Sequence, residues 1–408
     1  MLFKEYAATE NNPNWGKLIS RQAPLYERLD DIRTPFGRDY TRILHSTAYR
    51  RLKHKTQVFF NIENDHVCTR MEHVSHVESV SSTIAQSLGL NRELTRAISM
   101  GHDLGHAPFG HEGERIITAL SEEYLGKSFW HEQNGLRFVD EIELLEDNYR
   151  NYKNLNLTYA VRDGILSHCG EVDQNGISPR PISTTIEEFD APGKFQAVTW
   201  EGCVVKIADK IAYVGRDIED AIRLGLLDQT AQRKLEKMAQ VYDANAINTT
   251  VIMHNMIIDI CKNSSPDKGI MLSSAFFDQL NEIKAFNYER IYKHSRLEPF
   301  KEYARLVITQ IFKTLASFYD GKHTWNNLNE QRKFTPNLIA SFEHWLAQYC
   351  AANIVPAGPL KEISLKCENQ KIYGSLDSET VYFQAIIDYI SGMTDSFAIS
   401  LFNEMLSY

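Results

Sequence analysis

Cysteine is scarce in this chain of 408 residues, and no two cysteines form a C-x-x-C pair. The six are Cys68, Cys169, Cys203, Cys261, Cys350 and Cys367. A zinc knuckle needs closely paired cysteines, and a chain of this length buries enough apolar surface to fold without disulfide bonds. We therefore expect reduced thiols, as in a cytoplasmic protein.

Long apolar runs are also missing from the sequence. No segment approaches the ~20 consecutive apolar residues that a membrane-spanning helix needs. Residues 1–15 are polar and lack the apolar centre of a secretory signal. These absences predict a soluble, cytoplasmic protein with no membrane partner.

Basic residues are outnumbered, with 44 Lys and Arg against 53 Asp and Glu and a formal net charge of −9. This balance excludes a general nucleic-acid coat, which needs a basic face, so nucleic-acid binding is not indicated. The segment 33–57 is an exception, because it holds seven basic residues and one acid, Asp39. Arginine is suited to clamping phosphate, so we expect part of this segment to face a polyphosphate ligand.

Strand signals are few, and apolar residues recur at the three- and four-residue steps of helices. The predicted helices cover 74–88, 94–100, 116–120, 204–222, 303–319, 338–350 and 381–405. Asn91 is the expected N-cap of the second helix. Only 363–382, which contains Gly374, suggests a small β-hairpin. The sequence thus predicts a mainly α fold.

The chain shows no repeat and no low-complexity linker. The run Asn-Ser-Ser-Pro-Asp-Lys at 263–268 is the best candidate for an internal boundary. We predict a catalytic core over 1–262 and a helical C-terminal region over 263–408 that packs on it.

Two histidines and two aspartates fall on or beside apolar helix faces. They are His73, His102, Asp103 and Asp209. An unpaired buried carboxylate costs several kcal/mol unless a cation or donor compensates it. A single divalent cation shared by the four side chains is the economical explanation, and mixed imidazole and carboxylate ligands suit Mn, Fe, Co, Ni or Zn better than Ca.

The segment 102–114, His-Asp-Leu-Gly-His-Ala-Pro-Phe-Gly-His-Glu-Gly-Glu, ends one helix and begins another. His111 and Glu114 are three residues apart in the new first turn, so they share a face. A carboxylate placed there holds an imidazole in one tautomer, as acid–base catalysis requires. A metalloprotease is excluded, because neither His111-Glu112 nor His131-Glu132 is followed by the second histidine of H-E-x-x-H.

These residues carry a resemblance to a known family. His73, His102-Asp103 and Asp209 match the H…HD…D signature of the HD-domain metal-dependent phosphohydrolases. Further segments resemble the deoxynucleoside triphosphate triphosphohydrolases, the dGTPase-like branch, over roughly residues 30 to 400. They are Arg33-Thr34-Pro35-Phe36, Arg42-Ile43-Leu44-His45-Ser46, Tyr49-Arg50-Arg51-Leu52, Lys55-Thr56-Gln57-Val58, 102–114, 159–170, the helix around Asp209, and 388–395.

The resemblance implies an HD-domain helical bundle with additional C-terminal helices, and a role for each matching residue. It implies metal ligands at His73, His102, Asp103 and Asp209. It implies catalytic residues at His111, Glu114 and His131, phosphate contacts at Arg70 and Lys210, and sugar contacts at Gln57, Tyr213 and Asp217. The implied cofactor is one divalent ion, Mg, Mn or another first-row transition metal.

The expected reaction is hydrolysis of a deoxynucleoside triphosphate, with dGTP among the substrates, to deoxynucleoside and inorganic triphosphate. The resemblance also implies a homo-oligomer and a possible dNTP effector. Where the family commonly reads His-Asn-x-Gln, this chain reads His131-Glu132-Gln133-Asn134, which leaves base selectivity open. Two alternatives remain: an HD phosphohydrolase of nucleoside monophosphates or cyclic nucleotides, and a nucleotide-sensing or single-strand-binding protein with a vestigial site.

Overall fold

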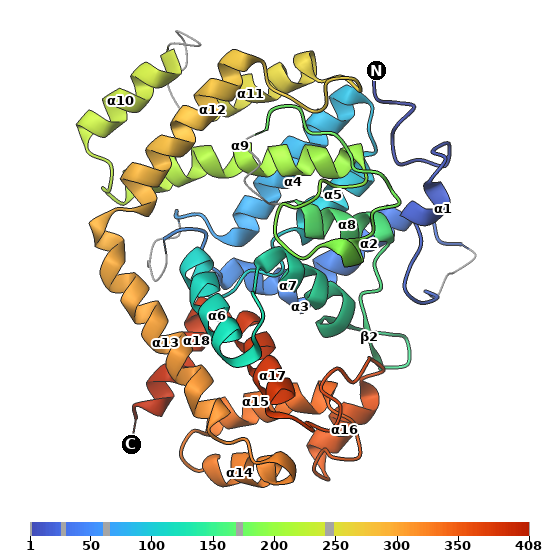
Figure 1. The fold of residues 1–408 in the computed structure, drawn as a ribbon, viewed down its shortest axis with the longest axis vertical. Helices are drawn as coiled ribbons and strands as arrows, with labels where there is room; N and C mark the ends of the chain where they lie inside the picture. Colours follow the sequence, from blue (N-terminus) through green and yellow to red (C-terminus); the bar gives the residue numbers. More distant parts are fainter. Residues whose placement is uncertain (1, 26–29, 60–65, 169–173, 241–248, 408) are drawn as a thin grey trace. The chain divides into compact units, whose positions relative to one another are not determined.

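Helices dominate the fold in the computed structural model, which describes residues 2–25, 30–59, 66–168, 174–240 and 249–407 (Figure 1). The first α-helices are α1 (Trp15–Leu18), α2 (Pro35–His45), α3 (Thr47–Arg51), α4 (Arg70–Leu88), α5 (Arg92–Gly101), α6 (Gly110–Leu125), α7 (His131–Arg137), α8 (Tyr159–Ser167) and α9 (Trp200–Arg223). The others are α10 (Gln229–Gln240), α11 (Thr249–Asn263), α12 (Ser274–Asn287), α13 (Glu298–Ala316), α14 (Thr324–Gln331), α15 (Pro336–Tyr349), α16 (Pro359–Lys366), α17 (Glu379–Ser391) and α18 (Asp395–Met405).

One small sheet is present among these described residues. Strands β1 (Leu144–Glu146) and β2 (Tyr152–Asn154) pair antiparallel, with Leu145 opposite Lys153. The mainly α prediction is confirmed, but the predicted position of the hairpin is wrong. Residues 363–366 end α16, and Gly374 makes only an isolated bridge to Cys350. Cys367 makes a second isolated bridge, to Tyr152 of β2, so this segment pairs at single residues with other parts of the chain instead of folding back on itself as a hairpin.

Helix positions follow the apolar periodicity of the sequence. Thr69 and Glu72 form a capping box at the start of α4, and the Asn91 side chain caps α5 as predicted. The predicted helix 381–405 is two helices, since α17 stops at Ser391 and Thr394 caps α18. Two caps within four residues end one helix and start the next.

Two compact units divide the chain. The first contains Met1–Leu44, Gln57–Asp103 and Asn156–Glu298, and the second contains His45–Thr56, Leu104–Leu155 and Pro299–Tyr408. Neither unit ends at residue 262, and the domain boundary expected there stays a prediction. Each unit is described below by itself.

The first unit is built around α9. This helix packs against α4, α5, α8, α11 and α12, and Figure 1 shows α4 and α5 beside it. Its apolar residues Val204, Ile211 and Ile218 join Ile84 and Leu88 of α4 in one buried cluster. Each such aliphatic side chain contributes about 1.5–3 kcal/mol on burial. The first unit therefore holds α4, α5 and α9 as a fixed frame.

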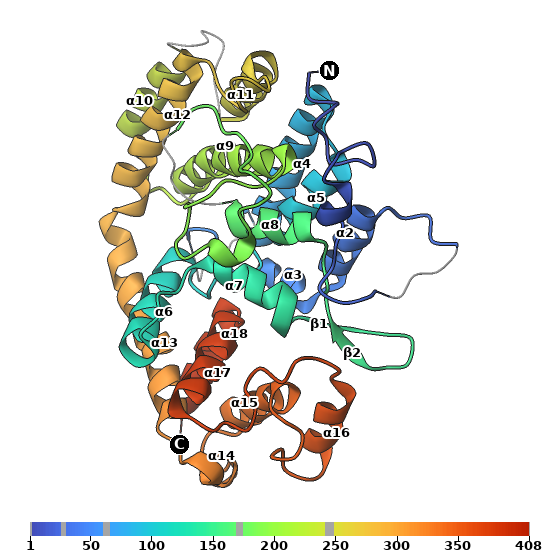
Figure 2. The ribbon, with the colours of Figure 1, turned by 45° about the vertical axis from the view of Figure 1, so that its right-hand side comes forward.

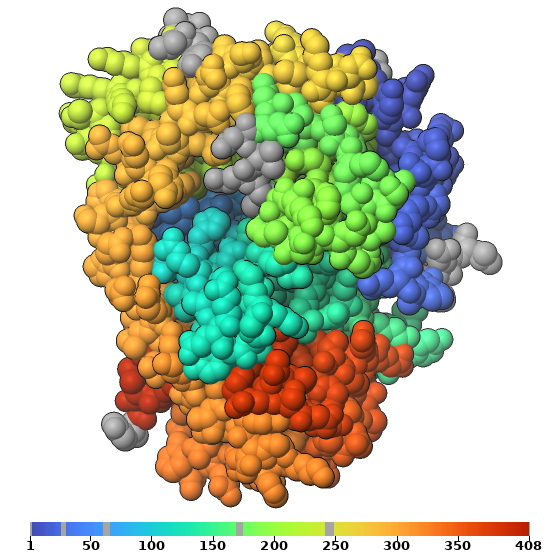
Figure 3. All heavy atoms as spheres, viewed as in Figure 1, coloured from blue at the N-terminus to red at the C-terminus, as the bar shows by residue number. Residues whose placement is uncertain are grey.

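The second unit is built around α6, α15 and α17. α6 contacts α17, and α15 contacts α14, α16, α17 and α18, an arrangement that can be followed in Figure 2. In Figure 3 the teal surface of α6 adjoins the red surface of the C-terminal segment. Buried rings such as Phe342, Tyr382 and Tyr389 fill the space between α15 and α17.

Disulfide bonds and membrane-spanning helices are both missing from the described residues. Cys68, Cys203, Cys261, Cys350 and Cys367 are free, whereas Cys169 lies outside the described residues, as does the end of the quoted segment 159–170. In the part of the chain that the structure describes, every helix is too short or too polar to cross a bilayer.

Candidate active site

Three helices of the first unit bring together the residues predicted to bind metal. His73 lies one turn into α4, His102 directly follows α5, and Asp209 lies on α9. The end of α5 reaches this position because Gly101 lies against Ile165 of α8, where an added Cβ would come within 2.6 Å of the Ile165 Cδ1. Close packing at Gly101 thus brings His102 near the other two predicted ligands, His73 and Asp209.

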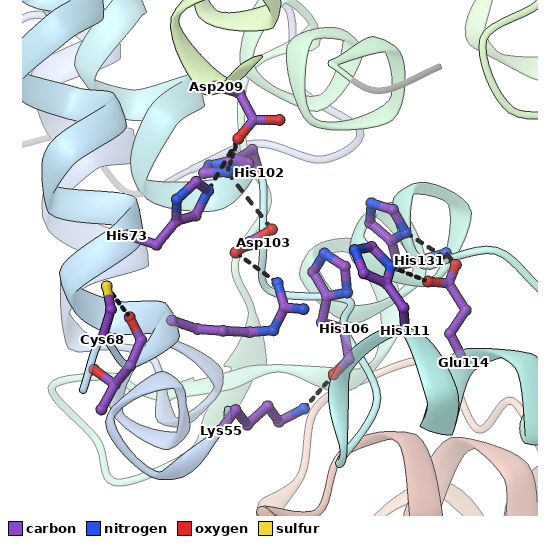
Figure 4. A network of polar contacts seen from close by, with 12 residues as sticks. Lys55, Cys68, His73, His102, Asp103, His106, His111, Glu114, His131 and Asp209 are labelled. Atoms are coloured by element: carbon purple, nitrogen blue, oxygen red, sulfur yellow. Dashed lines mark hydrogen bonds and ion pairs between the residues drawn. The ribbon is translucent and has the colours of Figure 1, made fainter. Parts of the chain in front are cut away.

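The three side chains converge on one point (Figure 4). His73 Nε2 lies 2.9 Å from Asp209 Oδ1, and His102 Nε2 lies 3.8 Å from the same oxygen. One ligand atom from each of these residues lies within 4.8 Å of the others. Asp103 is adjacent, with its Oδ1 3.5 Å from His102 Nε2.

The tautomer of His102 tests whether these residues fit a cation. Its Nδ1 lies 2.6 Å from the carbonyl oxygen of Ser99, which only accepts, so Nδ1 carries the proton. Nε2 then presents a lone pair toward the carboxylates of Asp103 and Asp209. Within the described residues this buried atom has no hydrogen-bond partner. A lone pair that faces two carboxylates is repelled by them, and a cation between the three groups removes that repulsion, so the donor set fits a divalent metal.

The electrostatics of the cluster agree with this fit. Burial alone would raise the pKa of Asp209, but the hydrogen bond from His73 and the charges of His73, His102 and His168 lower it to about 2. Burial would likewise lower the pKa of His73, yet the Asp209 hydrogen bond and the charge of Asp103 raise it. The Asp209 carboxylate therefore remains ionised and favours positive charge at this point.

Arg70 occupies the edge of the cluster. Its Nη1 donates to Asp103 Oδ2 at 2.9 Å, and the residue is only 1% exposed. Its Nε and Nη2 atoms are buried and have no hydrogen-bond partner among the described residues. A buried guanidinium with two idle donors next to a metal-type cluster fits the oxygens of an anionic ligand.

Three of the predicted substrate-contacting residues, Lys210, Tyr213 and Asp217, lie on α9, and a fourth, Gln57, lies between α3 and α4 in the sequence. Lys210 and Tyr213 are half-buried, and the buried Asp217 accepts a hydrogen bond from the hydroxyl of Tyr292. The Oε1 atom of Gln57 is buried without a hydrogen-bond partner in the described part of the chain. Tyr292, which lies beyond α12, is a hydrogen-bond partner of Asp217 that the sequence did not reveal.

The second unit holds a separate cluster around Glu114. His131 is its main partner, because Glu114 Oε1 accepts from the backbone N of His131 at 2.8 Å and from its Nδ1 at 2.9 Å. His111 Nδ1 lies 3.7 Å from Glu114 Oε2, beyond hydrogen-bond distance. The His111 side chain is 77% exposed and that of His131 only 8%. Glu114 thus orients His131 more firmly than His111.

His106 is a member of this cluster that we did not assign from the sequence. Its ring stacks on His131 with centroids 3.8 Å apart and an interplanar angle of 17° (Figure 4). His106, Glu114 and His131 are close enough to share an ion. Parallel rings, however, direct their in-plane lone pairs alongside one another rather than toward one point. The arrangement therefore favours proton transfer over metal binding.

The charge state of Glu114 supports that function. Burial alone would raise its pKa, but the charge of His131, the nearby His111 ring and the hydrogen bond from His131 hold the pKa of Glu114 well below its usual range. The ionised carboxylate stabilises a protonated imidazole beside it.

His168 is another residue that the sequence did not assign. It is buried after α8, its Nδ1 lies 2.7 Å from the carbonyl oxygen of Ile165, and its ring meets His102 edge to face at 5.0 Å. Its only sequence signal was its place in the quoted segment 159–170. The contact supports the His102 ring from the side of α8.

The α4–α5–α9 frame with its histidines and aspartates defines the class of protein. The HD domain family matches residues 70–214, which span all four predicted ligands. HD domains bind divalent metals, and the class consists of phosphohydrolases, so this chain is a metal-dependent phosphohydrolase by class.

Relatives match nearly the whole chain, and each is named deoxyguanosinetriphosphate triphosphohydrolase-like protein. The one from Caldanaerobacter subterraneus subsp. tengcongensis is 33% identical, over 95% of this chain and 89% of its own length. The one from Clostridium tetani is 33% identical, over 97% and 91%. The one from Rickettsia canadensis is 30% identical, over 95% and 97%. The chain therefore belongs to the family of deoxyguanosinetriphosphate triphosphohydrolase-like proteins.

Proposed function

We propose that this protein hydrolyses deoxynucleoside triphosphates, with dGTP among its substrates, to deoxynucleoside and inorganic triphosphate. The observation that carries the proposal is the buried Arg70, which holds Asp103 and keeps two donors idle beside the His73–His102–Asp209 cluster. A polyphosphate supplies the acceptors that these donors lack. The printed names of the relatives support the same substrate class.

We assign the metal to His73, His102, Asp103 and Asp209, with Mg, Mn or another first-row transition ion as the cofactor. A divalent ion bound there supplies Lewis-acid polarisation of a phosphoryl oxygen and a more acidic water. Arg70 and Lys210 bind phosphate oxygens and neutralise the charge that develops on them.

The histidines of the second unit supply the acid–base function in this proposal. Because His106 follows Asp103 by three residues in the sequence, we assign both clusters to one reaction. His131, held by Glu114, keeps a fixed ring orientation, and the exposed His111 moves a proton to or from the substrate. Whether His111 protonates the departing 5′-oxygen or steers the attacking water is decided by its pH profile.

The sugar is recognised on α9. Tyr213 packs under the deoxyribose, and Gln57 and Asp217 bind near its 3′-hydroxyl. The hydroxyl of Tyr292 orients the Asp217 carboxylate for this contact. Crowding at this position disfavours a ribose.

Product analysis tests the proposed reaction. The full chain is incubated with Mn or Mg and each of the four dNTPs, alone and in pairs, and with ribonucleotides, monophosphates and cyclic nucleotides. Separation on an anion exchanger is expected to show deoxyguanosine and triphosphate from dGTP. Release of pyrophosphate or orthophosphate contradicts the reaction, turnover only of monophosphates or cyclic nucleotides indicates the other HD chemistry, and no turnover indicates a vestigial site.

Two variants accompany this assay. His111→Ala removes an exposed side chain, so the fold is retained and turnover is expected to fall by about 10² to 10⁴. Asp103→Ala is expected to abolish both metal binding and turnover. Unchanged turnover in His111→Ala contradicts its assigned role.

We further propose a homo-oligomer located in the cytoplasm, with regulation by a dNTP effector. The free state of the five described cysteines supports the location. Light scattering after size exclusion gives the subunit number, and rate increases in the paired dNTP assays reveal an effector.

A further inference from the structure

The segment 388–395 resembles the family's, yet no role has been assigned to it so far. Its last residue, Asp395, begins α18 and is 7% exposed. The carboxylate accepts two backbone hydrogen bonds: Oδ1 from Phe109 N at 2.9 Å and Oδ2 from Thr56 N at 3.1 Å. All three residues belong to the second unit. One carboxylate thus joins segments that are hundreds of residues apart in the sequence.

Phe109 is an unusual residue to hold in this way. Its φ is 64° and its ψ is 23°, the left-handed region that a bulky residue rarely adopts. It directly precedes α6, two residues before His111 and three after His106. A conformation of this kind persists only where surrounding contacts enforce it. The hydrogen bond to Asp395 is such a contact, since it fixes the peptide plane that enters Phe109.

A second contact fastens the same loop to the C-terminal helices. The buried Lys55 side chain donates to the carbonyl oxygen of His106 and, at 3.0 Å, to that of Ser391 at the end of α17. A cation is favourable at this helix end. Lys55 therefore links the carbonyl oxygen of His106 to Ser391, and Asp395 binds the amide of Phe109, two residues before His111. Both ends of the loop are thus fastened to residues 391–395.

The loop is also tightly packed on its other sides. Asn134 donates to Gly105 O at 2.7 Å, and a Cβ at Gly113 would come within 1.7 Å of Pro108 O. The backbone between residues 105 and 113 thus has little freedom of its own. The orientation of the imidazole rings of His106 and His111 therefore depends on where the two ends of this loop are held.

We propose that Asp395 is a positioning residue for the histidine cluster: its carboxylate holds Phe109 in the left-handed conformation and so aims the rings of His106 and His111. The proposal rests on the proposed function, because it concerns the histidines assigned there. It adds a residue outside the HD match, nearly 300 positions downstream of the loop. A displacement of a reacting group by about 1 Å costs about 10²-fold in rate.

Asp395→Asn is the test variant. The amide keeps the shape of the side chain and one acceptor oxygen, but its NH₂ group faces a backbone N–H. We expect kcat to fall about 10- to 100-fold with KM within about threefold, because substrate contacts of the first unit are unaffected. We also expect the imidazole NMR resonances of His106 and His111 to shift. Lys55→Met, which removes the other tie, is expected to give the same pattern.

Glu404→Gln is the matched control, because Glu404 lies on the same helix and also accepts from two backbone N–H groups, those of Asn337 and Leu338. It should lower stability comparably while leaving kcat and the imidazole resonances unchanged. The proposal is overturned if Asp395→Asn keeps wild-type kcat and resonances, or if Glu404→Gln loses kcat equally. If the wild type hydrolyses no nucleotide, the proposed function fails, and the resonances alone decide the role of Asp395.

Discussion

Replacement of Arg70 by lysine measures the contribution of the two guanidinium donors that have no hydrogen-bond partner within the ranges that the structure describes. Lysine keeps a positive charge that can still pair with Asp103, but it lacks the Nε and Nη2 donors that have no hydrogen-bond partner among the described residues. A hydrogen bond to a charged group contributes about 1.5–3 kcal/mol, so two of them contribute about 3–6 kcal/mol. The variant should therefore lose about 10² to 10⁴ in kcat/KM for dGTP.

Two measurements check this magnitude. Steady-state release of triphosphate gives kcat/KM, and calorimetry with inorganic triphosphate gives the loss of phosphate binding without any turnover. Metal content, measured by mass spectrometry, should stay at the wild-type level, because Asp103 keeps a cationic neighbour. Arg96→Lys is the matched control, since Arg96 is a partly exposed arginine of α5 that pairs with Glu78. A kcat/KM of Arg70→Lys within about threefold of wild type, with equal triphosphate binding, would refute the reasoning.

Other changes have equally definite expected outcomes. Burial raises the pKa of Glu201, even though two backbone N–H groups donate to it, so the wild type loses stability as pH rises through that pKa. Glu201→Gln should gain stability relative to wild type as the pH rises above the ordinary pKa of a glutamate, by about 1.4 kcal/mol per unit of pKa elevation, as measured by urea unfolding. Gly105→Ala should destabilise by more than about 3 kcal/mol, because its Cβ would lie 2.1 Å from backbone atoms of α7. Gly16→Ala, where the Cβ meets no atom within 4 Å, should change stability by less than about 1 kcal/mol. Asp209→Asn should lower divalent-metal content at least about tenfold, as measured by mass spectrometry.

Each of these outcomes has a contrary result. A stability difference for Glu201→Gln that does not vary with pH would mean that the wild-type carboxyl is not destabilised by burial. Equal stability of the two alanine variants would mean that α7 does not approach Gly105 closely. If Asp209→Asn keeps its full metal content, the metal is not bound by the cluster of His73, His102 and Asp209.

The local parts of the fold and site were predictable from the sequence. Helix α4 with its caps, the Asn91 cap of α5 and the long α9 follow from apolar periodicity and from capping side chains within a few residues. The positions of His73, His102 and Asp209 on inward faces follow from the same periodicity. A local pattern is sufficient here because a helix is stabilised by contacts at three and four residues.

Tertiary packing decided the rest. The spacing of His111 and Glu114 suggested a pair, but the close partner of Glu114 is His131, 17 residues away. Helix spacing shows that two side chains share a face, but it does not show which side chain from another segment, here His131, forms the closer contact with Glu114. The hairpin predicted over 363–382 was wrong for a related reason: alternation forms a hairpin only where two segments pair over several residues, and here Cys367 and Gly374 each make one isolated bridge.

The sequence by itself determined which side chains are the candidates for the chemistry and which helix faces present them. Only the tertiary structure decided that Arg70 is buried with two idle donors, that His106 stacks on His131, and that Tyr292 and Asp395 support residues 75 and 286 positions away. The physical reason is distance along the chain. Local periodicity records the energetics of a single helix, whereas contacts between remote segments form only when the whole unit buries its apolar faces.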